Sequence, residues 1–250
     1  MNRTWFRRFG PAPQGGARLV CFPHAGASAT AYLGLSRSLA DCRGLDVLAV
    51  QYPGRQDRRQ EEPARGIDEL AETIADEFAP FADHPYSFFG HSMGAVVAYE
   101  TTRRLLRRRL PGPERLFLSG RGAPGPRPSP HDRLSGDAEV LAAVRRLGGT
   151  GSALLDDPEL LAMVLPALRA DYGALARYTA DAAEPLPIPV TALVGDGDPV
   201  VPVDEAAAWG ARTSGDFTLK VFSGGHFYLD TNVAEVAAVI SSSLLTDSPA

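Results

Sequence analysis

A serine between two glycines marks the point where an apolar run of this sequence gives way to a helical pattern. The segment 86–100 reads YSFFGHSMGAVVAYE, with Ser92 at the centre of Gly90-His91-Ser92-Met93-Gly94. On a sharp turn from strand to helix, flanking glycines let two backbones approach closely, and the serine hydroxyl is pushed out above the sheet edge. The segment therefore predicts an exposed nucleophile at the end of a strand.

Short apolar runs alternate with helical patterns on both sides of this turn. Strands are expected at 18–23, 45–52, 86–89, 115–119, 190–194 and 217–222, and helices at 28–40, 67–81, 93 to about 109, 204–213 and 231–245. Such alternation is typical of right-handed βαβ crossovers. The predicted fold class is α/β, with a mainly parallel central sheet and helices on both faces.

The alternation is interrupted once, between two proline-rich joints. Four prolines lie within 121–133 and three within 181–189, and only helical periodicity lies between them, at 135–147, 158–168 and 169–178. Prolines in such numbers exclude a continuous helix or a central strand. We therefore expect one domain over 1–250 with a helical insertion at about 123–186. The insertion is either a lid over the active site or a rigid helical subdomain, and its position on the side of the sheet where Ser92 lies favours a lid.

Composition excludes several classes of function. A net charge of −5 with no basic footprint argues against nucleic acid as the main partner. No window approaches the roughly 18 apolar residues of a membrane span, and no apolar segment follows the N-terminal charges as in a secretory signal. We expect a soluble, cytoplasmic monomer, in which Cys21 and Cys42 are free thiols.

A serine hydroxyl becomes a nucleophile only with a base in hydrogen-bond reach and a third group that orients the base. In doubly wound hydrolases these groups follow one another in the order Ser, acid, His. Of the five histidines only His226, in the loop after 217–222, lies beyond the late acidic candidates. Those candidates are Asp196 and Asp198, which both follow the strand at 190–194, and turn preferences lean toward Asp198 but leave both open.

Two backbone N–H groups are expected to hold the oxyanion that forms during acyl transfer. One belongs to the residue after the nucleophile, which is Met93, and the second to the loop after the first strand, where Ala25 is the candidate. His24 in that loop is expected to shape the loop through a hydrogen bond rather than to transfer protons.

Five arginines lie at the end of the helix that follows Ser92, at positions 103, 104, 107, 108 and 109. Cations at a helix C-terminus are favourable, so a solvated helix end is the leading explanation. A docking surface for an acidic partner is the alternative.

Together these motifs resemble one family along nearly the whole chain. The sequence is similar to free-standing type II thioesterases of polyketide and nonribosomal peptide assembly lines through FPHAGAS, AVQYPGR, FFGHSMGA, LFLSGR, GGT with LPALRADY, GDGDP and GGHFYL. The chain departs at Ala27, where the family often has glycine.

The resemblance implies an α/β-hydrolase fold with a helical lid over the substrate channel. It implies a triad of Ser92, Asp198 and His226, with Ala25 and Met93 as oxyanion donors, and neither a metal nor an organic cofactor. The implied reaction is hydrolysis of stalled acyl groups on the phosphopantetheine arm of a carrier protein. Alternatives are a generic carboxylesterase or acyl-CoA thioesterase, a terminating thioesterase of a larger synthase, and a catalytically silent protein that binds carrier proteins.

Overall fold

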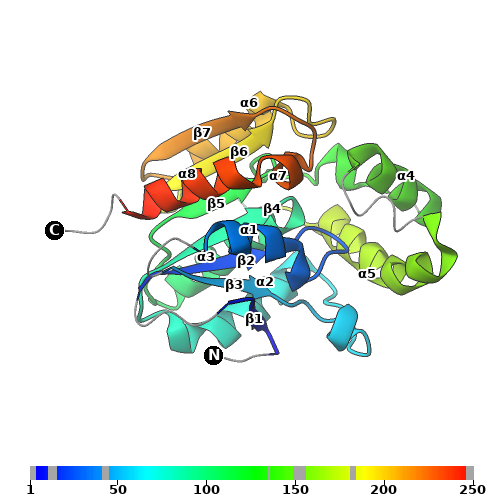
Figure 1. Ribbon diagram of the computed structural model, residues 1–250, viewed down its shortest axis with the longest axis horizontal. Helices are drawn as coiled ribbons and strands as arrows, with labels where there is room; N and C mark the ends of the chain where they lie inside the picture. Colours follow the sequence, from blue (N-terminus) through cyan, green and yellow to red (C-terminus); the bar gives the residue numbers. More distant parts are fainter. Residues whose placement is uncertain are drawn as a thin grey trace.

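Seven strands form one twisted sheet within the described residues of the computed structural model, which are 4–10, 16–40, 45–134, 136–148, 156–180 and 184–245 (Figure 1). The strands are β1 (Phe6–Arg8), β2 (Arg18–Phe22), β3 (Asp46–Val50), β4 (Tyr86–His91), β5 (Leu116–Ser119), β6 (Val190–Gly195) and β7 (Phe217–Phe222). Their order is β1-β3-β2-β4-β5-β6-β7, and every neighbouring pair is parallel except β1 with β3. The predicted mainly parallel sheet is confirmed, whereas the antiparallel edge strand β1 was not predicted.

Helices cover both faces of the sheet, as the α/β prediction requires. They are α1 (Leu33–Ser38), α2 (Ile67–Phe78), α3 (Met93–Arg107), α4 (Asp137–Leu147), α5 (Pro158–Arg177), α6 (Val203–Ala207), α7 (Tyr228–Thr231) and α8 (Val233–Leu245). In Figure 1, α1 and α8 lie in front of the sheet and α2 and α3 behind it. None of the described helices is long and apolar enough to cross a membrane.

The central strand β4 is buried along its whole length. Successive side chains of a strand point to opposite faces. Phe88 therefore packs into the core beneath α2 and α3, and Phe89 into the core beneath α1 and α8. This double burial explains why the run before Ser92 is mostly aromatic and shows no alternation with exposed polar residues.

The helical insertion lies between β5 and β6 and contributes no strand of the central sheet among its described residues. Its helices α4 and α5 pack against each other to the right of the sheet in Figure 1. The sequence predicted two helices where the structure has the single helix α5, which continues through Pro166. Pro166 and Ala162 both lie on the exposed face, so the carbonyl that proline leaves without a donor is on the solvent side of the helix.

The arginine cluster at the end of α3 is a solvated helix end only at Arg107 and Arg109, which are exposed. Arg103 and Arg104 are buried and both form ion pairs with the buried Glu100. Arg104 also contacts two acidic side chains of α2, Asp68 and Glu72. Arg108 pairs with acidic residues of α2 as well. Arg104 and Arg108 therefore link the end of α3 to α2, so their charges are already paired within the protein.

Candidate active site

The turn at Ser92 is the sharp strand-to-helix turn that the sequence predicts. Ser92 lies between β4 and α3 with φ 55° and ψ −118°, a left-handed conformation that is rare for a residue with a side chain. A Cβ on Gly90 would lie 2.2 Å from the carbonyl oxygen of Gly94, and a Cβ on Gly94 only 1.9 Å from that of Phe22. Both flanking glycines are thus required by close backbone contacts, which keep the serine in its strained conformation.

The acid and the histidine predicted from the sequence meet at the same edge of the sheet. Nδ1 of His226 and Oδ2 of Asp198 are 2.8 Å apart, and both side chains are almost completely buried. The other carboxylate oxygen of Asp198 accepts hydrogen bonds from the backbone N–H groups of Val200 and Val201. This arrangement holds the Asp198 carboxylate in one orientation and directs the Nδ1–H of His226 toward it.

Nε2 of His226 is left without a hydrogen-bond partner among the described residues, although it is buried. Ser92 and His226 line the same two pockets, and the structure has no hydrogen bond between them. Because Asp198 accepts from Nδ1–H, Nε2 is the nitrogen with a free lone pair, as a general base requires. In structures without substrate, hydrogen bonds of this kind are often not yet formed.

Asp196, the alternative acid, has a different position. Its Oδ1 accepts a hydrogen bond from the Gly224 N–H at 2.9 Å, and the residue is exposed. A Cβ on Gly195 would lie 2.4 Å from the Gly224 carbonyl oxygen. Asp196 and Gly195 thus join the loop that carries Asp198 to the loop that carries His226, and Asp198 alone of the two aspartates contacts the histidine.

The two expected oxyanion donors lie next to Ser92 in the chain and in the pockets that it lines. Met93 is the first residue of α3, so its N–H has no acceptor within the helix. Ala25 lines both pockets that contain Ser92. The loop makes its left-handed turn at Gly26, with φ 75°, whereas Ala27 has no positive φ. The departure from the family pattern at Ala27 therefore places no strain on this loop.

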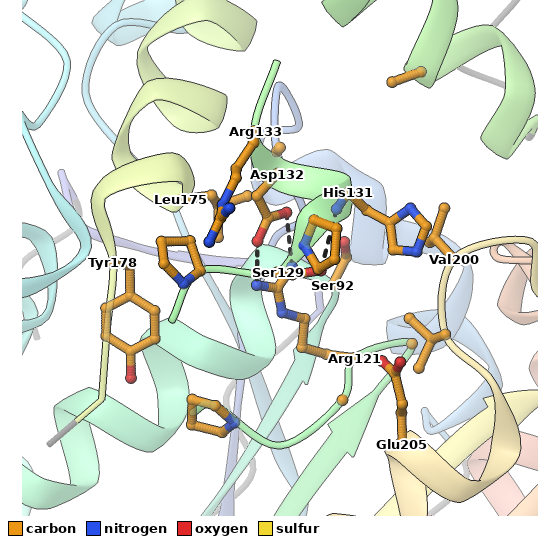
Figure 2. A pocket seen from close by; sticks show the side chains of 18 of the residues that line it. Ser92, Arg121, Ser129, His131, Asp132, Arg133, Leu175, Tyr178, Val200 and Glu205 are labelled. Carbon is orange, nitrogen blue, oxygen red and sulfur yellow. Dashed lines mark hydrogen bonds and ion pairs between the residues drawn. The ribbon is translucent and has the colours of Figure 1, made fainter. Parts of the chain in front are cut away.

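Two pockets diverge from Ser92 and His226. The first, here called the arginine pocket, has a volume of about 450 Å³ and is lined in part by Arg121, Arg127, Arg133 and Arg146. Figure 2 shows the ion pair between Arg121 and Asp132 close to Ser92 in this pocket. The second, the apolar pocket, has a volume of about 540 Å³. Its lining includes Val144, Met163, Val164 and Leu168 from α4 and α5.

Two further histidines surround the His226 ring and are uncharged at neutral pH. His91 is fully buried, and its Nδ1 forms a hydrogen bond with the Ser119 hydroxyl at 2.8 Å. Burial, reinforced by His226 and His24, lowers the pKa of His91 well below its usual value. Burial, with smaller effects of His226 and Arg55, lowers the pKa of His24 to about 3. The His24 ring packs against Phe227 and His91, and the described residues provide no side-chain hydrogen bond for the loop-shaping role expected of it.

These two histidines should make the fold sensitive to acid. In the unfolded chain a histidine binds a proton below about pH 6.5, whereas His24 and His91 do not until the pH is much lower, so the free energy of unfolding should fall as pH drops below 6.5. Each contributes up to about 1.4 kcal/mol per pH unit. The free energy of unfolding of His91→Gln, measured in urea between pH 6.5 and 4.5, should change with pH by about one proton less than that of the original protein. An unchanged dependence on pH in His91→Gln would contradict the prediction.

Two residues at the site lie in motifs of the sequence, but no role was predicted for them. Arg55 of AVQYPGR and Asp171 of LPALRADY form a buried ion pair beside Gly26. Their charge and their place in motifs were the available signal, but no pattern in the sequence indicated that they pair across more than 100 residues.

Comparisons with known proteins agree with this geometry. A family profile described as Thioesterase domain matches residues 17–244. Thioesterase PikA5 of Streptomyces venezuelae is 46% identical over 96% of this chain and 85% of that protein. A protein of Streptomyces griseus described as a probable cadicidin biosynthesis thioesterase is 42% identical over 97% of this chain and 66% of its own length.

A solved structure shows the same likeness in three dimensions. The type II thioesterase BorB from the borrelidin biosynthetic cluster superimposes with a TM-score of 0.87 at 42% identity, over 96% of this chain and 98% of that chain. The match covers the sheet, the helices on both faces and the insertion. The α/β-hydrolase fold implied by the sequence is thus confirmed.

Proposed function

Because this chain belongs to the thioesterase family, we propose that it is an editing type II thioesterase that removes stalled acyl groups from the phosphopantetheine arms of carrier proteins. The observation that carries the proposal is the buried hydrogen bond between His226 and Asp198, which leaves Nε2 of His226 free in the pockets that contain Ser92. A cytoplasmic location, where such synthases work, is part of the proposal.

The proposed reaction proceeds through an ester on Ser92. His226 Nε2 takes the hydroxyl proton of Ser92 as the oxygen attacks the thioester carbonyl, and Asp198 stabilises the imidazolium that results. The backbone N–H groups of Ala25 and Met93 hold the oxyanion, and a well-placed donor of this kind contributes about 3 kcal/mol. The pantetheine thiol leaves with the proton from His226. A water molecule, activated by the same histidine, then hydrolyses the acyl ester and releases the acid.

The two pockets suit the two sides of a thioester. We assign the acyl chain to the apolar pocket, because aliphatic side chains of α4 and α5 line it. The pantetheine arm then occupies the arginine pocket. Arg127, Arg133 and Arg146 are exposed at that pocket, and guanidinium groups bind phosphate well. In this assignment α4 and α5 act as a lid that closes over both halves of the substrate.

Intact-protein mass spectrometry tests this function directly. Carrier proteins loaded with acetyl, propionyl, butyryl and malonyl groups are incubated with the enzyme, and loss of the acyl mass is followed with time. We expect unloading of at least one chain and a transient acyl adduct on Ser92. The matched control is an oxyester of equal chain length, which should react more slowly. Faster oxyester hydrolysis would favour a carboxylesterase, and binding of carrier protein without any unloading would indicate a silent binding protein.

A further inference from the structure

The carboxylate of Asp171 on helix α5 contacts the backbone of the loop that holds Ala25. Oδ2 of Asp171 accepts a hydrogen bond from the N–H of Gly26 at 2.7 Å, across 145 residues of sequence. The Asp171 side chain is 8% exposed, so this bond is shielded from water. Gly26 is the residue directly after Ala25, whose own N–H is the proposed oxyanion donor.

A second group fixes the same carboxylate. The Arg55 guanidinium, which is 6% exposed, forms an ion pair with Oδ2 of Asp171 and donates a hydrogen bond to the Pro53 carbonyl. Removing one partner of a buried ion pair leaves a charge without compensation, so each of these side chains restricts the position of the other. The loop after β3 and helix α5 therefore hold the Asp171 oxygen against Gly26 together.

Helix α5 also contacts Gly26 by packing. A Cβ on Gly26 would lie 2.4 Å from Cδ2 of Leu168, so the Leu168 side chain packs directly against this glycine. Leu168 and Asp171 are three residues apart and hence neighbours on one helix face. One turn of α5 thus contacts Gly26 with both an apolar side chain and a carboxylate.

These contacts bear on the oxyanion site because the Ala25–Gly26 peptide adjoins the peptide that carries the Ala25 N–H. A hydrogen bond to the Gly26 N–H sets the orientation of that whole peptide group and so restricts the ψ angle of Ala25. The bond also occupies the Gly26 N–H, which leaves the neighbouring N–H of Ala25 as the donor of this turn.

We propose that Asp171 is a positioning residue, which holds the Ala25–Gly26 peptide so that the Ala25 N–H points to the site where the oxyanion forms. The Ala25 N–H is then in position to bind the oxyanion only when helix α5 is packed against this loop. The inference rests on the proposed function, because it concerns an intermediate of that reaction.

The test compares Asp171→Ala with the original enzyme on a small acyl thioester, with rates expressed per active site titrated by a fluorophosphonate. We expect kcat to fall about 10- to 100-fold, because the donor is misplaced rather than removed, with KM changed by less than about threefold. The inhibition constant of a trifluoromethyl ketone analogue, which forms a tetrahedral adduct on Ser92, should rise by about the factor by which kcat/KM falls. Asp171→Asn retains an oxygen acceptor for Gly26 and should recover much of the lost kcat.

Two further variants separate positioning from stability. Asp137→Asn breaks an exposed ion pair between α4 and Arg169 of α5, the helix that carries Asp171, and should leave kcat and the inhibition constant unchanged. The double variant Arg55→Met with Asp171→Leu leaves no buried charge unpaired, so its thermal midpoint should exceed that of Asp171→Ala while kcat stays low.

Different outcomes would overturn the positioning role of Asp171 and the proposed function. If the original enzyme turns over acyl thioesters, and Asp171→Ala and the double variant match it in kcat and in inhibition constant, the positioning role is overturned while the proposed function stands. If the original enzyme hydrolyses no acyl thioester, the proposed function is overturned and the positioning role with it.

Discussion

Ser92→Ala should lower the rate of acyl release by about four to six orders of magnitude, since the remaining groups of a serine triad retain only residual catalysis. Without the hydroxyl, no acyl ester can form and His226 has no proton to take. The measurement is the unloading rate of an acyl carrier protein, followed by intact-protein mass spectrometry. The acyl adduct should be absent from the variant at every time point.

Ser87→Ala is the matched control for this experiment. Ser87 lies in the same strand, β4, and its buried hydroxyl has no hydrogen-bond partner among the described residues. Its removal therefore leaves the site intact and costs little stability. Equal losses of activity in the two variants would show that disruption of β4, rather than loss of a nucleophile, explains the result. Turnover by Ser92→Ala close to that of the original enzyme would refute the proposed mechanism.

Asp198→Asn should reduce kcat by about 10⁴-fold, because an amide favours the wrong tautomer of the histidine. The amide nitrogen introduced by this substitution would donate to Nδ1 of His226, which places the remaining ring proton on Nε2 and removes the lone pair that accepts the serine proton. The fold should survive, since the other side-chain oxygen can still accept from the N–H groups of Val200 and Val201. Steady-state kinetics on an acyl thioester, combined with a thermal melt, measures both effects.

Asp196→Asn provides the comparison. This exposed residue lies two positions away, and its replacement keeps an oxygen that can accept from the Gly224 N–H. We expect kcat within about threefold of the original enzyme, because an exposed substitution that preserves its hydrogen bond has a small effect. A large loss in Asp196→Asn with full activity in Asp198→Asn would reverse the assignment of the acid.

Most of the sheet could be predicted because its signals are local. Runs such as 86–89 are buried on both faces and hence mostly apolar, and each is followed by a helical pattern. The edge strand β1 has only three residues, of which two are arginines, so no such pattern marks it. Helix α5 was divided in the prediction at a point near Pro166, but packing of its buried face keeps it continuous.

The candidate site was likewise predicted in part. The glycine-flanked turn indicated Ser92, and chain order and loop position indicated His226, because the carboxyl ends of parallel strands meet at one edge of a sheet. The family resemblance, with turn preferences, indicated Asp198 rather than Asp196. The role of Arg103 and Arg104 was predicted wrongly, since the sequence does not reveal that Glu100 is buried beside both of them or that Asp68 of α2 lies beside Arg104.

The sequence by itself thus determined the elements, their alternation and the three chemically distinctive side chains, since each depends on neighbours within a few positions or on the order of the chain. Only the tertiary structure decided that Asp171 reaches Gly26 and Arg55, and that two pockets open from Ser92. The physical reason is that such contacts join residues more than 100 positions apart. Their geometry follows from how the helices pack on the sheet, which no local pattern encodes.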